Sequence, residues 1–251
     1  MTSETKPIYM VVPCYNEEKR LNLEYWNELI DIAGTKWIFV NDGSTDNTLN
    51  LLQGIKNASV ISLEKNVGKA EAIRQGVVST FEALNQDDFS FGYIDADGAF
   101  AVEDIRKLVR IAHDSEYHFE GIWGARVKLA GRNINRRDLR HILSRVIITI
   151  IGLKIKNLPY DLQTGLKIFK FNKESMTVFD KKFETRWFVD LEIYLRFKMA
   201  TQRVLKIWEE PLNNWEDVSG SKVRGFQLVQ IMRDLFRVIQ ISARTEKSKW
   251  T

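Results

Sequence analysis

The feature that most limits the fold is an alternation in the first half of the chain between short apolar runs and amphipathic segments. Apolar runs of strand length occur at Ile8–Val12, Trp37–Val40, Val60–Leu63, Phe89–Ile94 and Gly121–Gly124. Such runs are expected of strands that are buried on both faces. Between them, apolar residues spaced by three and four predict helices over Glu18–Ile32, Thr45–Lys56, Lys69–Leu84 and Val102–His113. Repeated β-α units of this kind predict an α/β fold, with a mostly parallel sheet flanked by helices.

Polar clusters follow three of these predicted strands at the points where the strands end. They are Pro13–Glu17, Asn41–Ser44 and Asp95–Gly98. Open parallel sheets bind ligands beyond the carboxyl ends of their strands. The coincidence therefore predicts a ligand site at this edge of the sheet.

The second half of the chain has a less regular pattern. It predicts helices over Leu139–Ile155, Val189–Met199 and Phe226–Ile241, and strands over Leu166–Phe169 and Val204–Ile207. No repeat, low-complexity tract or linker rich in proline and glycine divides the 251 residues, so we expect one domain over residues 1–251.

Composition narrows the setting of the protein. A chain with 44% hydrophobic and 28% charged residues is typical of a globular protein. Cys14 is the only cysteine, which excludes an intramolecular disulfide, fits a reducing compartment and favours a structural thiol. The start of the chain lacks an apolar signal segment, and the longest apolar run, Val146–Leu153, is far below the ~20 residues that span a bilayer. We therefore expect a cytoplasmic chain that does not cross a membrane by itself.

A basic block lies in the middle of the chain. Its members are Arg126, Lys128, Arg132, Arg136, Arg137, Arg140, Arg145, Lys154 and Lys156, opposed only by Asp138. Such a block suits a partner with phosphate groups, and the alternative is a solvated surface. The predicted helix over Leu139–Ile155 has a broad apolar face beside these charges, so it either lies in an anionic membrane interface or packs on the core.

Asp95 and Asp97 are the main candidates for chemistry. Two carboxylates form a hard-oxygen site for Mg²⁺ or Mn²⁺, which in proteins usually also binds substrate phosphates. An Asp-x-Asp pair alone is often a turn or a helix cap. Its position after a buried strand, with Asp42 at the end of another, favours the metal site.

Other polar residues at the same edge of the sheet could bind a ligand or have a purely structural role. Asp42 can bind a base or ribose while Ser44 or Thr45 caps the following helix. Lys69, at the predicted start of the third helix, either faces a base or phosphate or lies in solvent.

Taken together, these segments resemble family-two inverting glycosyltransferases of the GT-A type, a Rossmann-like fold. The family opens with a Pro-x-Tyr-Asn-Glu segment, here at residues 13–17. The match narrows to dolichyl-phosphate glucosyltransferases and, more loosely, mannose synthases. It narrows through four further segments: Asp95–Ala99, Asp161–Phe169, Arg186–Glu192, and Trp215 followed by Gly220–Lys222.

The resemblance implies the transfer of a hexose, with UDP-glucose as the expected nucleotide-sugar donor, to a polyprenyl (dolichyl) phosphate acceptor, with inversion and with Mg²⁺ or Mn²⁺. It assigns donor binding to Pro13, Tyr15, Glu17, Asp42, Lys69, Asp95 and Asp97, and the metal to the last two. It assigns the reacting centre to Asp161, Gln163 and Asp190, and the phosphates to Arg126, Arg137 and Lys222. Residues 1–125 would form the nucleotide-binding half, 126–222 the acceptor and sugar half, and 223–251 a C-terminal helix and tail.

Three features depart from the family pattern. Many eukaryotic relatives carry an N-terminal membrane anchor that is not seen here, so the lipid would be presented through peripheral contact or a separate membrane subunit. Ala125 stands where the glucosyl relatives have Ser. Ala99 stands where mannose synthases have a Gln that assists the metal, which favours the glucosyl branch.

Several other functions stay open on the sequence alone. One is a family-two enzyme that acts on a glycan hydroxyl, for which Asp190 would serve as general base. Another is a non-catalytic protein that binds nucleotide sugars. A nucleotidylyltransferase would need a Gly-rich phosphate loop after the first strand, which Pro13–Glu17 does not supply. Binding of nucleic acid through the basic block is the weakest alternative, and we expect no nucleic-acid partner.

Overall fold

The computed structural model describes residues 6–84, 89–114, 118–135, 158–216 and 225–247, together with 149, 151, 152 and 155. Nine strands are assigned in these ranges: β1 (Ile8–Cys14), β2 (Thr35–Asn41), β3 (Ala58–Ser62), β4 (Ser90–Ile94), β5 (Gly121–Ala125), β6 (Asn133–Asn135), β7 (Leu166–Lys170), β8 (Ile207–Pro211) and β9 (Asn214–Glu216). The helices with assigned bounds are α1 (Leu23–Ile30), α2 (Thr48–Gln53), α3 (Lys69–Ala83), α4 (Val102–His113), α6 (Lys173–Asp180), α7 (Val189–Thr201) and α8 (Gly225–Lys247).

Seven of the strands form one sheet with the order β3-β2-β1-β4-β7-β5-β8. The pairs β1–β2, β1–β4, β2–β3 and β5–β8 are parallel. Strand β7 is antiparallel to both of its neighbours, β4 and β5. The predicted α/β fold with a mostly parallel sheet is therefore confirmed. Strands β6 and β9 pair separately as a short two-stranded sheet.

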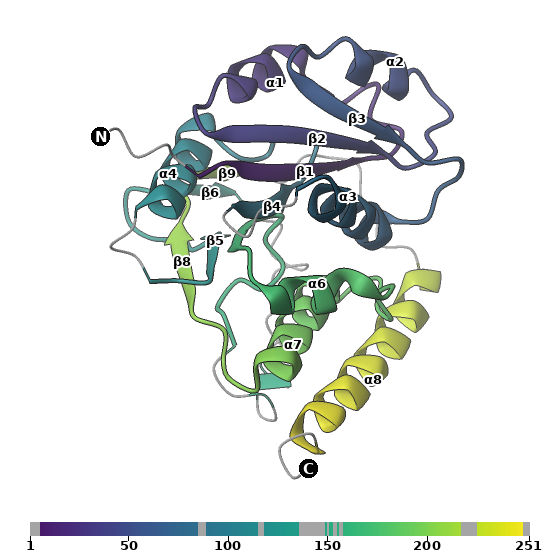
Figure 1. Ribbon diagram of the computed structural model, residues 1–251, viewed down its shortest axis with the longest axis vertical. Helices are drawn as coiled ribbons and strands as arrows, with labels where there is room; N and C mark the ends of the chain where they lie inside the picture. The colour runs from purple at the N-terminus through teal and green to yellow at the C-terminus, as the bar shows by residue number, and fades with distance from the viewer. Residues whose placement is uncertain are drawn as a thin grey trace.

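Helices cover both faces of the large sheet, and each face has its own hydrophobic core (Figure 1). Helices α1, α2 and α4 pack on one face, and α3, α6, α7 and α8 contribute to the core on the other. Strand β1 shows how the pleat supplies both cores, because Met10 and Val12 belong to the first while Val11 belongs to the second. All three side chains are fully buried.

The sequence predicted the elements of the first half better than those of the second. Helix α4 has the predicted bounds, and α3 begins at Lys69 as expected. The strand predicted at Val204–Ile207 was wrong in position, since β8 begins at Ile207. Helix α6 and the short strands β6 and β9 were not predicted.

The last helix lies at the edge of the molecule. Figure 1 shows α8 in yellow alongside α7, with one side turned away from the sheet. The Asp234 carboxylate anchors α8 by accepting hydrogen bonds from the backbone N–H groups of Arg186 (2.7 Å) and Trp187 (3.0 Å). Within the described part of the chain, no helix combines the length and the hydropathy that spanning a bilayer requires.

Candidate active site

The loops that follow β1 and β2 are tied together at the carboxyl edge of the sheet. The backbone N–H of Asn16 donates to Ser44 Oγ (3.0 Å), and the N–H of Thr45 donates to Asn16 Oδ1 (2.9 Å). Asn16 has a φ of 53°, a left-handed conformation that Asn tolerates better than most residues. The expectation that Ser44 or Thr45 caps the next helix was wrong. The N-cap of α2 is Asn47, and the hydroxyl of Ser44 is used to hold the neighbouring loop.

Asp42, at the end of β2, organises the entrance to α3. Its carboxylate accepts hydrogen bonds from the N–H groups of Val67 (2.7 Å) and Gly68 (2.9 Å) and from Asn66 Nδ2 (3.1 Å). Burial raises the pKa of Asp42, and the hydrogen bonds from Val67 and Gly68 oppose that shift. Asp42 thus fixes the loop that presents Lys69. Its contact with a nucleoside stays a prediction.

Asp95 and Asp97 lie in the turn after β4, as predicted. Asp95 pairs with the ammonium of Lys69, a partner that neither interpretation of Lys69 anticipated. Asp97 Oδ1 accepts a hydrogen bond from the N–H of Ala99 (3.2 Å). Burial and the nearby charge of Asp95 raise the pKa of Asp97. The two carboxylates are therefore close enough to repel each other, and a cation between them would relieve the repulsion.

The space for Asp95 depends on a glycine from another strand. A Cβ added at Gly165, just before β7, would lie 2.2 Å from Asp95 Oδ2. The N–H of Asp95 also donates to the carbonyl of Gly165 (3.0 Å). Gly165 therefore lets the turn that holds Asp95 and the start of β7 approach closely.

Glu17 comes to the same place from the end of β1. It is 7% exposed, and its Oε1 binds Arg20 at 2.5 Å. Its Oε2 is buried with no hydrogen-bond partner among the described residues. Burial raises the pKa of Glu17 and Arg20 opposes the shift, while Asp97 and Asp95 raise it further. An orphaned buried oxygen beside two more carboxylates indicates an acidic site with capacity for a ligand.

Arg126 and Asp161 form a buried pair on the other side of β7. The Nε and the backbone N–H of Arg126 donate to Asp161 Oδ2 at 2.7 and 2.9 Å, and Nη2 donates to Oδ1 at 2.7 Å. Glu209 Oε1 accepts from the N–H of Asp161 (2.8 Å). The guanidinium also lies 4.9 Å from the ring centre of Trp215. The sequence assigned these two residues to separate roles, and the structure joins them.

Asp190 faces the site from the first turn of α7. Its Oδ1 accepts from Lys167 Nζ (2.8 Å) and from the hydroxyl of Tyr93. Glu192, two residues later, points elsewhere and accepts from the N–H groups of Glu184 and Thr185, both at 2.8 Å. Of the two acids, the structure therefore brings Asp190 and not Glu192 to Lys167 and Tyr93. The role of Asp190 at the reacting centre stays a prediction.

Lys167 and Tyr93 were not predicted as site residues. Lys167 is fully buried in β7. Its apolar neighbours Leu166 and Ile168 predict the strand, but they give no indication of a role for the lysine between them. A lysine inside a buried strand is costly without a partner, so its charge was the available signal. Burial lowers the pKa of Lys167, and the charge of Asp190 opposes that shift.

The remaining predicted residues have less defined surroundings. Tyr15 is 43% exposed at the end of β1, where Pro13 is half-buried. Gln163 is half-buried in the loop before β7. Cys14 is buried, and burial raises the pKa of its thiol, as expected of a structural cysteine. Arg137, Lys222 and most of the Leu139–Ile155 segment lie outside the described residues.

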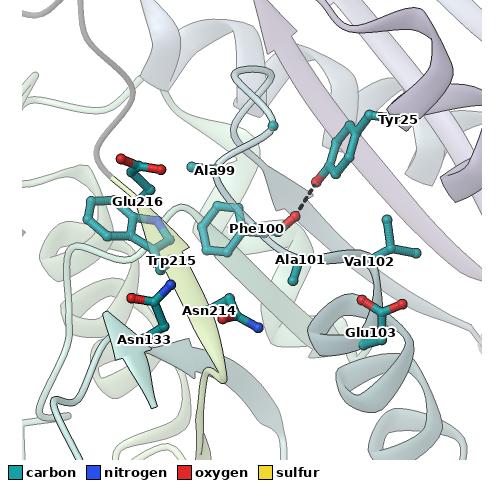
Figure 2. A pocket seen from close by; sticks show the side chains of 11 residues that line it. Tyr25, Ala99, Phe100, Ala101, Val102, Glu103, Asn133, Asn214, Trp215 and Glu216 are labelled. Carbon is teal, nitrogen blue, oxygen red and sulfur yellow. Dashed lines mark hydrogen bonds between the residues drawn. The ribbon is translucent and has the colours of Figure 1, made fainter. Parts of the chain in front are cut away.

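A shallow groove of about 360 Å³ adjoins the acidic turn (Figure 2). It is lined by the segment after Gly98 and by residues of β6 and β9, and Phe100 and Trp215, which pair in an isolated β-bridge, both belong to the lining. Tyr25 closes one end by donating from its hydroxyl to the carbonyl of Phe100 (2.9 Å). Trp215 thus lines this groove and also contacts the Arg126 guanidinium.

Fold and site together define a GT-A-type glycosyltransferase that uses a nucleotide sugar. The profile of Glycosyl transferase family 2 matches residues 9–176, and the chain belongs to this family. Its relatives include dolichyl-phosphate beta-glucosyltransferases. One from Trichomonas vaginalis is 30% identical, with 91% of this chain and 72% of the relative covered. The human dolichyl-phosphate beta-glucosyltransferase is 30% identical, with 93% and 75% covered.

Solved structures support the fold. Glucosyl-3-phosphoglycerate synthase from Mycobacterium tuberculosis, in complex with Mn²⁺, UDP-glucose and phosphoglyceric acid, superposes with a TM-score of 0.66. It is 16% identical, and the match covers 95% of this chain and 80% of that one. TarS from S. aureus in complex with UDP has a TM-score of 0.59, is 16% identical, and is matched over 65% of its length and 95% of this chain. Both of these proteins were solved with a uridine nucleotide bound, and the first also with Mn²⁺.

Proposed function

We propose that this protein transfers glucose from UDP-glucose to a polyprenyl phosphate of the dolichyl type, with inversion at the anomeric carbon. The observation that carries the proposal is the meeting of Asp95, Asp97 and Asp190 at one edge of the sheet. They meet in a chain that is 30% identical to dolichyl-phosphate glucosyltransferases over more than nine-tenths of its length. Desolvation lowers the pKa of Lys69, but the charges of Asp95, Asp190 and Asp97 raise it above its ordinary value, as expected of an ammonium that lies near all three acids.

The acidic turn fits a divalent cation. No set of three or more His, Cys, Asp or Glu side chains among the described residues is placed to hold a metal. Mg²⁺ and Mn²⁺, however, need only one or two carboxylates when substrate phosphates complete their coordination. Asp95 and Asp97 supply that number, and Gly165 leaves their turn the space it needs. When bound, the cation would supply charge neutralisation for the departing diphosphate.

Different side chains of the protein bind the diphosphate, the nucleoside and the hexose. Lys69, paired with Asp95, adds a positive charge where the diphosphate would lie. Glu17, Asp42 and Tyr15 frame the nucleoside side of the edge. Asp190 presents Oδ2 toward the reacting centre, since Oδ1 is already occupied by Lys167 and Tyr93. We assign Oδ2 to a hydroxyl group of the bound hexose.

The nature of the acceptor decides whether a protein base is needed. A phosphate monoester, with a second pKa of about 6, is mostly dianionic at neutral pH and can attack without losing a proton. A sugar hydroxyl must lose one, and general base catalysis contributes about 10²–10⁴-fold. Asp190 would be indispensable only in the second case.

The test is a donor and acceptor screen with Asp190→Asn as the probe. UDP- and GDP-hexoses are offered with Mn²⁺ to a short polyprenyl phosphate and to glycan hydroxyl acceptors, with transfer and hydrolysis both measured. We expect UDP-glucose and the polyprenyl phosphate to react, and Asp190→Asn to lose about 10- to 100-fold, the worth of one hydrogen bond to a charged group. Transfer to hydroxyl acceptors alone, or near-complete loss with the phosphate acceptor, would refute this mechanism.

Peripheral contact with a membrane on its cytoplasmic side would bring the lipid acceptor to the site. The segment predicted for this contact, Leu139–Ile155, lies mostly outside the described residues, but α8 offers a second surface. Met232, Phe236 and Ile239 are 59%, 61% and 36% exposed at helical spacing. The exposed face of α8 over residues 232–244 also carries Arg233 and Arg244 and no acidic residue. An apolar stripe flanked by arginines suits an anionic lipid surface.

Sedimentation with vesicles tests this contact. The protein should bind vesicles that contain anionic phospholipid more than neutral ones, and Phe236→Ser with Met232→Ser should reduce binding about tenfold or more because apolar burial is lost. Leu23→Ser, at a position 39% exposed in α1 on the opposite face of the sheet, is the matched control. Equal binding by the α8 variant and the control would remove α8 from the proposal.

A further inference from the structure

Strand register places Lys167 between two aromatic rings. Tyr93 of β4 and Trp123 of β5 are its direct partners across the sheet. The ammonium lies 4.8 Å from the ring centre of Trp123 and 5.5 Å from that of Tyr93. A cation between aromatic faces is favourable, but the lysine is fully buried, so it also needs hydrogen-bond acceptors.

Those acceptors come from the loop before β7 and from the first turn of α7. The carbonyl of Thr164 and Oδ1 of Asp190 both accept from Lys167 Nζ. Because Asp190 lies in the first turn of α7, Lys167 joins β7 to this helix at the edge of the site. Tyr93 donates its hydroxyl to the same oxygen of Asp190.

The two oxygens of Asp190 are therefore not equivalent. Oδ1 is held by an ammonium and a phenol, while no described residue donates to Oδ2. The Asp190 side chain is 14% exposed, whereas that of Lys167 is inaccessible, so a ligand can reach Asp190 but not Lys167. Any rotation of the carboxylate away from this orientation breaks its hydrogen bonds with two buried donors, Lys167 and Tyr93, and is therefore unfavourable.

We propose that Lys167, with Tyr93, is a positioning residue that acts through Asp190 by fixing the orientation of its carboxylate, so that one oxygen is held inside the protein and the other faces the substrate. Neither residue touches the donor or the acceptor. This inference rests on the proposed function, because the role of Oδ2 is defined by the bound hexose. The same arrangement of donors predicts how Asp190→Asn changes the site. The fixed donors would hold the amide oxygen at the Oδ1 position and turn the amide nitrogen, a donor, toward the substrate.

A double-mutant cycle tests the inference. Lys167→Met keeps the length of the side chain and removes its charge, and Lys173→Met, at an exposed position, is the control. We expect Lys167→Met to lower kcat about 10- to 100-fold with the KM for the donor changed less than about threefold. In an Asp190→Asn background the same substitution should change kcat by less than about twofold, because the residue it acts through is already altered. Equal losses in both backgrounds would overturn the proposal.

Tyr93→Phe removes one hydroxyl and leaves the ring, with Tyr9→Phe as its control. It should lower kcat about three- to tenfold and again add nothing to Asp190→Asn. Thermal unfolding separates this role from a structural one, since a loss of activity that tracks a falling Tm in Lys167→Met and Tyr93→Phe alike would contradict positioning.

A crystal structure of Lys167→Met gives a readout that does not depend on turnover. The carboxylate of Asp190 should rotate or occupy more than one orientation. An unchanged Asp190 would overturn the inference even if the enzyme is active. An inactive wild-type protein with a reoriented Asp190 in the variant would instead refute the proposed function and leave the positioning intact.

Discussion

Two loops flank the strand pair β4–β7, and they differ in how many hydrogen bonds their carboxylates accept. In the turn of residues 95–99, Asp97 accepts one backbone hydrogen bond and shares its surroundings with a second carboxylate and an orphaned oxygen of Glu17. In the loop of residues 160–165, Asp161 accepts three hydrogen bonds from Arg126 and is 4% exposed. The first loop has capacity for a ligand, whereas the second holds the structure.

The difference separates two meanings of an acidic residue at a sheet edge. A carboxylate whose oxygens are already occupied contributes to stability, and its removal leaves buried donors unpaired. A carboxylate kept close to others without enough donors is strained by repulsion, and its removal relieves the fold while it damages binding. Substitutions of the two kinds should therefore affect different measurements.

The largest expected effect is on stability, for Asp161→Asn. Removing one partner of a buried ion pair costs about 3–5 kcal/mol, because Arg126 loses a carboxylate that accepts three of its hydrogen bonds. Chemical denaturation should show this loss in the free energy of unfolding. A stability equal to that of the wild type would mean that the 160–165 loop does not hold the structure, and the comparison would fail.

Asp97→Asn should give the converse result. Transfer should fall about 10²–10³-fold, because electrostatic stabilisation of the leaving diphosphate is lost. The free energy of unfolding should stay equal or rise, because Asp97 no longer repels Asp95. Activity assays with saturating Mn²⁺ and denaturation of the same preparation check both parts. An unfolding loss comparable to that of Asp161→Asn would erase the distinction between the loops.

Gly165→Ala probes the contact between the two loops and should have the smallest effect of the three. The added Cβ would meet the carboxylate of Asp95, which must turn aside, so the affinity for Mn²⁺ in the presence of UDP should fall about tenfold. Titration calorimetry measures this change. Gly54→Ala, where the nearest atom to a new Cβ is 3.3 Å away, is the matched control and should leave the affinity unchanged.

The sequence predicted the ligand edge because its signals are local. Each polar cluster directly follows an apolar run, and the alternation of Met10, Val11 and Val12 into two cores is the burial that such a run predicts. The amino-acid pattern alone therefore groups Asp95 and Asp97 with Glu17 at one edge of the sheet. Their roles toward donor and metal stay predictions.

The two buried ion pairs on either side of the second loop could not be predicted from local patterns. Arg126 and Asp161 are 35 positions apart, and Lys167 and Asp190 are 23 apart, so no periodicity links them. Their contacts depend on β7 running antiparallel between β4 and β5, and a five-residue apolar strand carries no mark of its direction. Strands β6 and β9, of three residues each, are too short for a pattern of alternation.

The buried ammonium of β7 has a consequence for how the chain finds its fold. Leu166 and Ile168 fill one core of the sheet, while Lys167 and Phe169 face the other. If the register of β7 against its neighbours shifted by one residue, each side chain would change faces. The three apolar side chains would still be buried in a hydrophobic core after such a shift. Such a shift would carry the charge of Lys167 into the core beneath α4, out of reach of Asp190. A β7 misaligned by one residue would therefore bury a charge among apolar side chains, and the native alignment avoids that penalty.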